Sequence, residues 1–178
     1  QTSAGELKGK SLVLATGALT PKLAKIVGWR APIEPGKGYS LTMKRPGICP
    51  DVPLIFPETR EAVTPFADGY RLGSTMEFSG YDDSIHPKRL NLLRSGVEDY
   101  LKEPYAEPVT NTWYGWRPMT YDSLPIIGPC PGNPKVTLAT GHNMLGLSLA
   151  PATGKLVAEA LTGQDSHIEV GPYSPDRF

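Results

Sequence analysis

The amino-acid sequence predicts a mixed fold, part α/β and part α+β, in which the closing elements of a doubly wound domain flank an antiparallel sheet. Short apolar runs near Val13 and near Leu138 are typical of strands in a parallel sheet. Between them, from residue 35 to about residue 112, strand-like pieces alternate with turns, which is typical of an antiparallel sheet. The order of these two textures predicts one domain interrupted by a second.

The first predicted segment, residues 1–34, belongs to the interrupted domain. Its apolar run, Ser11–Ala15, ends at Thr16-Gly17, and we expect it to be a strand buried on both faces. A short helix should follow, because Pro21 is well tolerated in a first helical turn and Gly28 is a typical helix end.

The second predicted segment, residues 35–118, is an antiparallel substrate domain. One helix should start near Pro87, where Leu90, Leu93, Val97 and Leu101 recur at helical spacing. The predicted strands cover residues 38–43, 60–65, 69–78 and 112–118, with an A-D-G turn before the third of them.

The chain then returns to its first texture in residues 119–163, which we assign to the interrupted domain. Strands are expected at residues 125–128 and 135–141, and a helix from near Gly146 or Leu147 to Gly163. Residues 164–178 are interpreted as a terminal extension.

Charge and cysteine content argue against several classes of function. The 18 basic and 18 acidic residues form no run of either sign, so neither nucleic acid nor an anionic membrane surface is an expected partner. No apolar run approaches the roughly 20 residues that span a bilayer, and the N-terminus lacks the apolar core of a signal peptide. Cys49 and Cys130 have no metal-ligand spacing, so we expect free thiols in a reducing compartment and no metal site.

The segment G-H-N-M-L-G-L-S, residues 141–148, is the strongest candidate for a binding loop. It leads into the N-terminus of a helix, where unpaired backbone N–H groups favour negative charge, and its glycines let a ligand approach the backbone. The alternative is a glycine-rich start of a core helix that binds nothing. The fingerprint G-x-G-x-x-G of dinucleotide sites does not occur in the chain.

Four segments together resemble one family of enzymes. They are S-L-V-L-A-T-G-A-L-T-P-K-L-A, P-G-K-G-Y-S-L-T, A-V-T-P-F-A-D-G-Y-R-L-G-S-T-M-E-F, and W-Y-G-W-R-P-M-T-Y-D-S-L-P-I-I-G followed by L-A-T-G-H-N-M-L-G-L-S-L-A-P-A-T-G. In this order they resemble the FAD-dependent oxidoreductases of the D-amino-acid oxidase type (the DAO family), most of all the D-amino-acid dehydrogenase branch, with glycine oxidase nearby. Family members are longer and bind the ADP half of FAD with their N-terminal region. The resemblance therefore implies a C-terminal fragment that is inactive alone.

The resemblance also implies a set of cofactor-binding residues along the flavin. They are His142, Asn143, Leu145, Gly146, Leu147 and Ser148, together with Gly17. No metal ligand and no catalytic acid–base residue is implied, because the flavin carries the chemistry.

Arg117 is the predicted anchor for a substrate carboxylate. Alternation along residues 112–117 puts Trp113, Gly115 and Arg117 on one face, so we expect open space beside the guanidinium. A planar guanidinium pairs with a carboxylate through two hydrogen bonds, although an arginine before a proline is more often in a surface ion pair. Met76, Met144 and Tyr39 are further substrate-binding candidates. The alternatives are core packing for a methionine and a surface hydroxyl for Tyr39.

The implied reaction is oxidative deamination of D-amino acids by hydride transfer from the substrate Cα to flavin N5. The implied partners are a small amino acid or amine and an electron acceptor, oxygen or a quinone chain, but not nucleic acid. The parent is expected to be a cytoplasmic enzyme of amino-acid catabolism, with peripheral membrane association left open. The alternatives are an enzyme for glycine, sarcosine or hydroxyproline, and a flavin-free module that binds a carboxylate or a protein.

Overall fold

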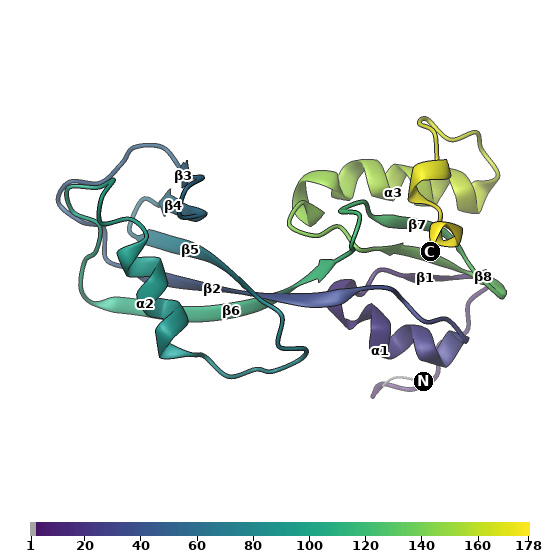
Figure 1. The fold of residues 1–178 in the computed structure, drawn as a ribbon. Helices are drawn as coiled ribbons and strands as arrows, with labels where there is room; N and C mark the ends of the chain where they lie inside the picture. Colours follow the sequence, from purple (N-terminus) through teal and green to yellow (C-terminus); the bar gives the residue numbers. More distant parts are fainter. Residues whose placement is uncertain (1–2) are drawn as a thin grey trace. The chain divides into compact units, whose positions relative to one another are not determined.

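The computed structural model describes residues 3–178, and the chain divides into two compact units (Figure 1). Unit 1 combines the chain up to Pro35 with Arg117–Phe178, and unit 2 is Gly36–Trp116. Unit 2 is thus an insertion between the two sequence halves of unit 1. Each unit has its own hydrophobic core.

The sheet of unit 1 has the strand order β1-β8-β7, with bounds Leu12–Leu14 for β1, Asn133–Thr140 for β8 and Ile126–Cys130 for β7. Strand β1 runs parallel to β8, as the apolar runs predict, and Val13 lies opposite Thr137. Strand β7 runs antiparallel to β8, so the sheet is mixed.

The expectation that β1 is buried on both faces is wrong for this chain. Leu12 is 49% exposed and Val13 is 39% exposed, and only Leu14 is buried. The reason is the position of β1 at the edge of the sheet, where β8 is its neighbour within the described residues.

Helices lie on opposite sides of this sheet in Figure 1, α1 (Thr20–Ala24) on one side and α3 (Gly146–Thr162) on the other. Short 3₁₀ turns, Gly17–Leu19 and Lys25–Val27, flank α1. The predicted helix ends are confirmed, since Gly28 and Gly163 both have left-handed backbones with φ of 83° and 69°. The core between these layers contains Leu14, Ala24, Ala31, Ile33, Ile126, Cys130, Val136 and Leu138.

The C-terminal residues pack onto unit 1, although the sequence suggested an extension. Two 3₁₀ turns, Gly171–Tyr173 and Pro175–Arg177, contact β7, and Pro175 is buried. Arg177 Nε donates to Asp122 Oδ2 at 2.7 Å. This ion pair joins the end of the chain to the turn before β7.

Unit 2 is built on a five-stranded sheet with the order β3-β4-β5-β2-β6. The bounds are Glu34–Met43 for β2, Leu54–Phe56 for β3, Glu61–Pro65 for β4, Tyr70–Glu77 for β5 and Val109–Met119 for β6. The pairs β3/β4, β4/β5 and β2/β5 are antiparallel, which confirms the predicted sheet. The three-residue strand β3 was not predicted.

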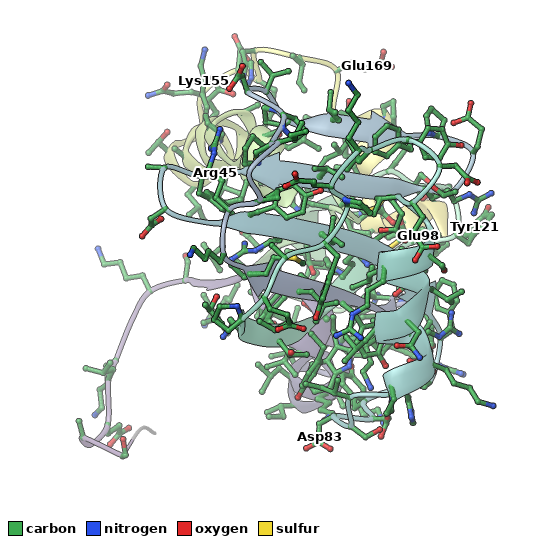
Figure 2. The ribbon with its side chains drawn as sticks, turned by 90° about the vertical axis from the view of Figure 1, so that its left-hand side faces the viewer. Arg45, Asp83, Glu98, Tyr121, Lys155 and Glu169 are labelled. Atoms are coloured by element: carbon green, nitrogen blue, oxygen red, sulfur yellow. The ribbon has the colours of Figure 1, made fainter. Side chains whose placement is uncertain are left out.

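Helix α2 (Pro87–Ser95) lies against the sheet of unit 2 (Figure 1) and contacts β5. Leu93 and Val97 are fully buried, as their spacing predicts. The regular helix ends before Gly96, and the chain continues as turns where the sequence predicted further helix. Exposed Asp83 and Glu98 extend outward from this region (Figure 2).

None of the helices in residues 3–178 is long and apolar enough to cross a bilayer. The same residues contain no group of His, Cys, Asp and Glu side chains that could hold a metal ion. Cys49 and Cys130 are both free thiols.

Candidate functional site

The carboxyl ends of β1 and β8 bring two predicted cofactor segments together in unit 1. The strands are parallel neighbours, so the turn at Gly17 and the loop at Gly141 leave the same edge of the sheet. A chain of hydroxyl groups joins them: Thr20 Oγ1 lies 3.1 Å from Thr16 Oγ1 and 2.8 Å from Thr140 Oγ1, and Thr140 donates to the Gly17 carbonyl at 3.3 Å. This edge is where open α/β sheets bind their ligands.

The N-terminus of α3 presents backbone N–H groups and apolar side chains at the surface of unit 1. Leu145 occupies the N-cap position, and no side chain in the described part of the chain caps the helix. The N–H groups of the first turn, from Gly146 to Ser148, therefore keep their donor capacity. Around them, Leu147 is 96%, Met144 67% and Leu145 58% exposed.

This combination suits a flat apolar group with an anionic edge. The helix end favours negative charge, and the exposed apolar side chains gain free energy when a ligand covers them. The isoalloxazine ring of a flavin has these properties, so the residues present at this helix end fit the cofactor.

The loop also contains a neutral histidine. His142 Nε2 lies 2.8 Å from Thr153 Oγ1 on α3, and the imidazole is partly buried. Burial lowers the pKa of His142 below its ordinary value, so the ring is uncharged at neutral pH. Its contact with Thr153 holds the loop against the helix that follows.

Asn143 has a side chain that is fully used inside the protein. Its Oδ1 accepts the Thr120 N–H at 3.0 Å, and its Nδ2 donates to Thr120 Oγ1 at 3.1 Å and to the Gly141 carbonyl at 2.9 Å. The backbone N–H of Asn143 is also used, by the Pro118 carbonyl, so Asn143 has no N–H group left to donate to a ligand.

Gly141 is required for a reason that the sequence did not reveal. Its φ is +72°, and an added Cβ would lie 2.7 Å from Thr120 Cγ2. The absence of a side chain at Gly141 lets the loop pack against Thr120. The sequence had suggested instead that the glycine lets a ligand approach the backbone. For Gly146 the ligand argument stays open, because the nearest atom to an added Cβ is His142 Cβ at 3.8 Å.

Arg117 lies in the last part of β6, in unit 1 and next to the loop. It is half-buried, and burial lowers the pKa of its guanidinium, which nevertheless stays charged in proteins. The carbonyl of the next residue, Pro118, accepts the Asn143 N–H at 3.1 Å. Unit 1 therefore joins the predicted carboxylate anchor to the predicted flavin loop.

The expected open space at Gly115 is filled. An added Cβ at Gly115 would lie 2.3 Å from the Trp113 ring, so the indole covers this glycine. Trp113 and Gly115 do share a face of β6, as alternation predicts, but the glycine makes room for the indole itself.

The other two substrate candidates belong to unit 2. Met76 lies on β5 at a register shift against β2, between Lys37 and Tyr39, and the preceding Thr75 has a φ of +63°. Such bulges often direct side chains at binding sites. Tyr39 is buried, and its hydroxyl donates to Glu77 Oε2 at 2.5 Å, so it is not the surface hydroxyl considered as an alternative. The substrate roles of both residues stay predictions.

Sequence reasoning missed an ion pair in unit 2 between a buried lysine and a partly exposed aspartate. Lys37 is fully buried; its Nζ donates to Asp82 Oδ2 at 2.7 Å and to the Ser84 carbonyl, and lies 5.2 Å from the ring centroids of Tyr39 and Tyr114. Burial lowers the pKa of Lys37, but the hydrogen bonds outweigh it and the net pKa is raised. In the alternating pattern of β2, Lys37 falls on the same side as the core residues at positions 39, 41 and 43. This pattern was the available sequence signal for the burial of Lys37.

Glu61 is a second buried charge that the sequence did not reveal. It is 2% exposed, and its Oε2 has no hydrogen-bond partner among residues 3–178. Burial raises the pKa of Glu61 to about 7. The side chain packs against Gly96, where an added Cβ would lie 2.6 Å from Glu61 Cγ.

Unit 1 is a domain with a mixed sheet and a candidate binding loop, and an antiparallel unit interrupts it in sequence. Comparison with known proteins gives the family. The model of the FAD dependent oxidoreductase family (DAO) matches residues 1–160, and the chain belongs to this family. The family prediction is confirmed, and the family is one of FAD-dependent oxidoreductases.

Named relatives agree with this assignment. The chain is 36% identical over 177 residues to a glycine oxidase of Pseudomonas aeruginosa, covering 98% of this chain and 48% of that protein. It is 32% identical over 180 residues to a D-amino acid dehydrogenase of Rhizorhabdus wittichii, covering 100% and 43%. Among solved structures, glycine oxidase from Geobacillus kaustophilus shares the fold, with a TM-score of 0.89 at 24% identity over 99% of this chain and 48% of that one. The chain spans about half the length of these relatives.

Proposed function

We propose that this chain is the C-terminal part of an FAD-dependent enzyme that oxidatively deaminates D-amino acids. Residues 35–118 would form its substrate domain, and residues 1–34 and 119–163 would complete its FAD domain. The observation that carries the proposal is the hydrogen-bonded junction between the strand end at Arg117 and the loop at the N-terminus of α3. The D-amino acid dehydrogenase relative supports the choice of substrate.

The residues of the loop would hold the flavin end of FAD. Backbone N–H groups of Gly146, Leu147 and Ser148 would donate to its pyrimidine carbonyl edge, where the helix end stabilises negative charge. Leu145 and Leu147 would cover its apolar surface and exclude water, and the exposed Met144 would contact the substrate. The ADP half would bind the N-terminal region of the parent, and this chain alone would be inactive. Bound FAD would supply the hydride acceptor, N5, for the hydrogen on the substrate Cα.

Arg117 would bind the substrate carboxylate through two parallel hydrogen bonds. Its partial burial strengthens such a pair, because fewer water molecules compete for the guanidinium. The pair would fix the orientation of the Cα–H bond, and orientation is the main task of the protein when the cofactor carries the chemistry. No side chain need act as a general base if the amine binds uncharged. Electrons would pass on to oxygen or to a quinone chain, in the cytoplasm or at the membrane surface.

A second substrate class is favoured by one specific observation. The glycine oxidase relative has the higher identity, 36% against 32% for the D-amino acid dehydrogenase. Glycine and N-methylated amines such as sarcosine are therefore the alternative substrates.

The test is anaerobic flavin bleaching by the full-length parent holoenzyme with D-amino acids, glycine and sarcosine. We expect D-amino acids to bleach the flavin fastest. In Arg117→Leu the KM should rise about 100-fold or more, because charge-assisted hydrogen bonds contribute about 1.5–3 kcal/mol each. The exposed Arg30→Leu in the same unit is the control for loss of a positive charge. Faster bleaching by glycine would show that glycine, and not a D-amino acid, is the preferred substrate. An equal effect of Arg117→Leu and Arg30→Leu on the KM would contradict the role of Arg117 as carboxylate anchor.

A further inference from the structure

The loop at the N-terminus of α3 is tied to the end of β6 through one residue. The Asn143 N–H donates to the Pro118 carbonyl at 3.1 Å, and the Thr120 N–H donates to Asn143 Oδ1 at 3.0 Å. Asn143 Nδ2 donates to Thr120 Oγ1 at 3.1 Å. These contacts span the first and third residues after Arg117.

The same side chain also holds its own loop. Asn143 Nδ2 donates to the Gly141 carbonyl at 2.9 Å, and Asn143 has a φ of 52°, a left-handed conformation that asparagine tolerates better than most residues. The partner, Thr120, is itself buried and fixed, since its Oγ1 donates to the Leu124 carbonyl at 2.9 Å. Both donors of the amide are therefore in use, and they connect two segments 23 positions apart in the sequence.

We propose that Asn143 is a positioning residue that sets the place of the Arg117 anchor relative to the flavin-facing backbone of residues 144–148. The inference rests on the proposed function. Its physical basis is a set of hydrogen bonds from one residue. Asn143 bonds to Pro118 and Thr120, which closely follow Arg117 in the chain, and it also bonds to Gly141 in its own loop. Movement at these hydrogen bonds would change the distance between a bound carboxylate and the cofactor, and small misplacements of reacting groups lower rates strongly.

The discriminating substitution is Asn143→Asp, which keeps the size of the side chain and an acceptor for the Thr120 N–H. It replaces the donor to Gly141 with a carboxylate oxygen, which would face the carbonyl oxygen across 2.9 Å and repel it. Asn143→Gly is the second variant. It tolerates the positive φ and keeps the backbone N–H, but it has no amide. Asn91→Asp on the exposed surface of α2 controls for the added charge.

The experiment uses the parent holoenzyme and measures flavin content, then the Kd of propionate from the change it causes in the flavin absorption spectrum. Propionate has the carboxylate but no amine, so its binding reports the anchor without turnover. We expect Asn143→Asp and Asn143→Gly to keep bound FAD and to raise the Kd about tenfold or more. In the Arg117→Leu background the Asn143 substitutions should add little, because residues that act as a unit are not additive. Asn91→Asp should behave as the wild type.

Three outcomes would overturn the inference. Additive effects of the substitutions at positions 117 and 143 would show that Asn143 acts independently of the anchor. Loss of FAD from both Asn143 variants would show a purely structural role. A propionate Kd unchanged in Arg117→Leu alone would remove the proposed anchor itself, and would thereby separate failure of the proposed function from failure of the positioning role.

Discussion

Replacement of Gly141 by alanine should destabilise the protein by about 2–5 kcal/mol, for two separate reasons. The φ of +72° is unfavourable for an L-residue with a Cβ, which costs about 1–2 kcal/mol. The new methyl group would lie 2.7 Å from Thr120 Cγ2, and overpacking of this kind costs about 1–3 kcal/mol. The sum is a large part of the stability of about 5–15 kcal/mol that ordinary domains have.

Gly163→Ala is the matched control, because it carries the cost of a positive φ but no steric clash of the new methyl group. Gly163 has a φ of +69°, but an added Cβ there meets no atom within 4 Å. Urea unfolding of both variants, followed by circular dichroism, should show Gly141→Ala less stable than Gly163→Ala by about 1–3 kcal/mol. Thr120→Ser removes Cγ2, so it should recover most of this difference when combined with Gly141→Ala. Equal destabilisation at the two glycines would refute the reasoning.

Two further predictions concern the buried charges of unit 2. Because burial raises the folded-state pKa of Glu61 to about 7, above its unfolded value, the contribution of Glu61 to stability should be highest below about pH 4.5 and decline by about 3 kcal/mol as pH rises to 7. Glu61→Gln should abolish this decline in urea unfolding at several pH values, whereas the exposed Glu98→Gln should leave it unchanged. Lys37→Met should destabilise the protein in the same assay, because it removes the hydrogen bonds of the buried ammonium group and leaves the partly exposed Asp82 without this partner. Lys37→Met with Asp82→Asn should be less destabilised, and no recovery would contradict the ion-pair argument.

Periodicity predicted most of the elements, because it reports which face of an element is buried. Leu93 and Val97 recur at helical spacing and are both fully buried in the core of unit 2. The glycines at 28 and 163 end their helices as predicted. Strand β3 was missed because three residues are too few to show a period, and β1 was called buried because a run of apolar residues does not reveal that its strand is at an edge.

The candidate site was predicted from a family resemblance and not from periodicity. Arg117 and the loop 141–148 were suggested by resemblance to a family, and the family is confirmed. The structure adds that both lie in unit 1 and that Asn143 joins them. It also changes the reason for Gly141, from access for a ligand to contact with Thr120. That contact could not be inferred, because nothing local in the sequence indicates which side chain lies above a glycine.

The sequence by itself determined most of the elements and their order, the helix ends at Gly28 and Gly163, and the membership of an FAD-dependent family, because these depend on local conformational preference and on motifs. Only the tertiary structure decided which polar side chains are buried and paired. Lys37 with Asp82, Glu61 against Gly96, and Asn143 with Thr120 are contacts between residues 23 or more positions apart. The stability of a buried polar group depends on the partner that replaces water. That partner is known only after the chain has folded.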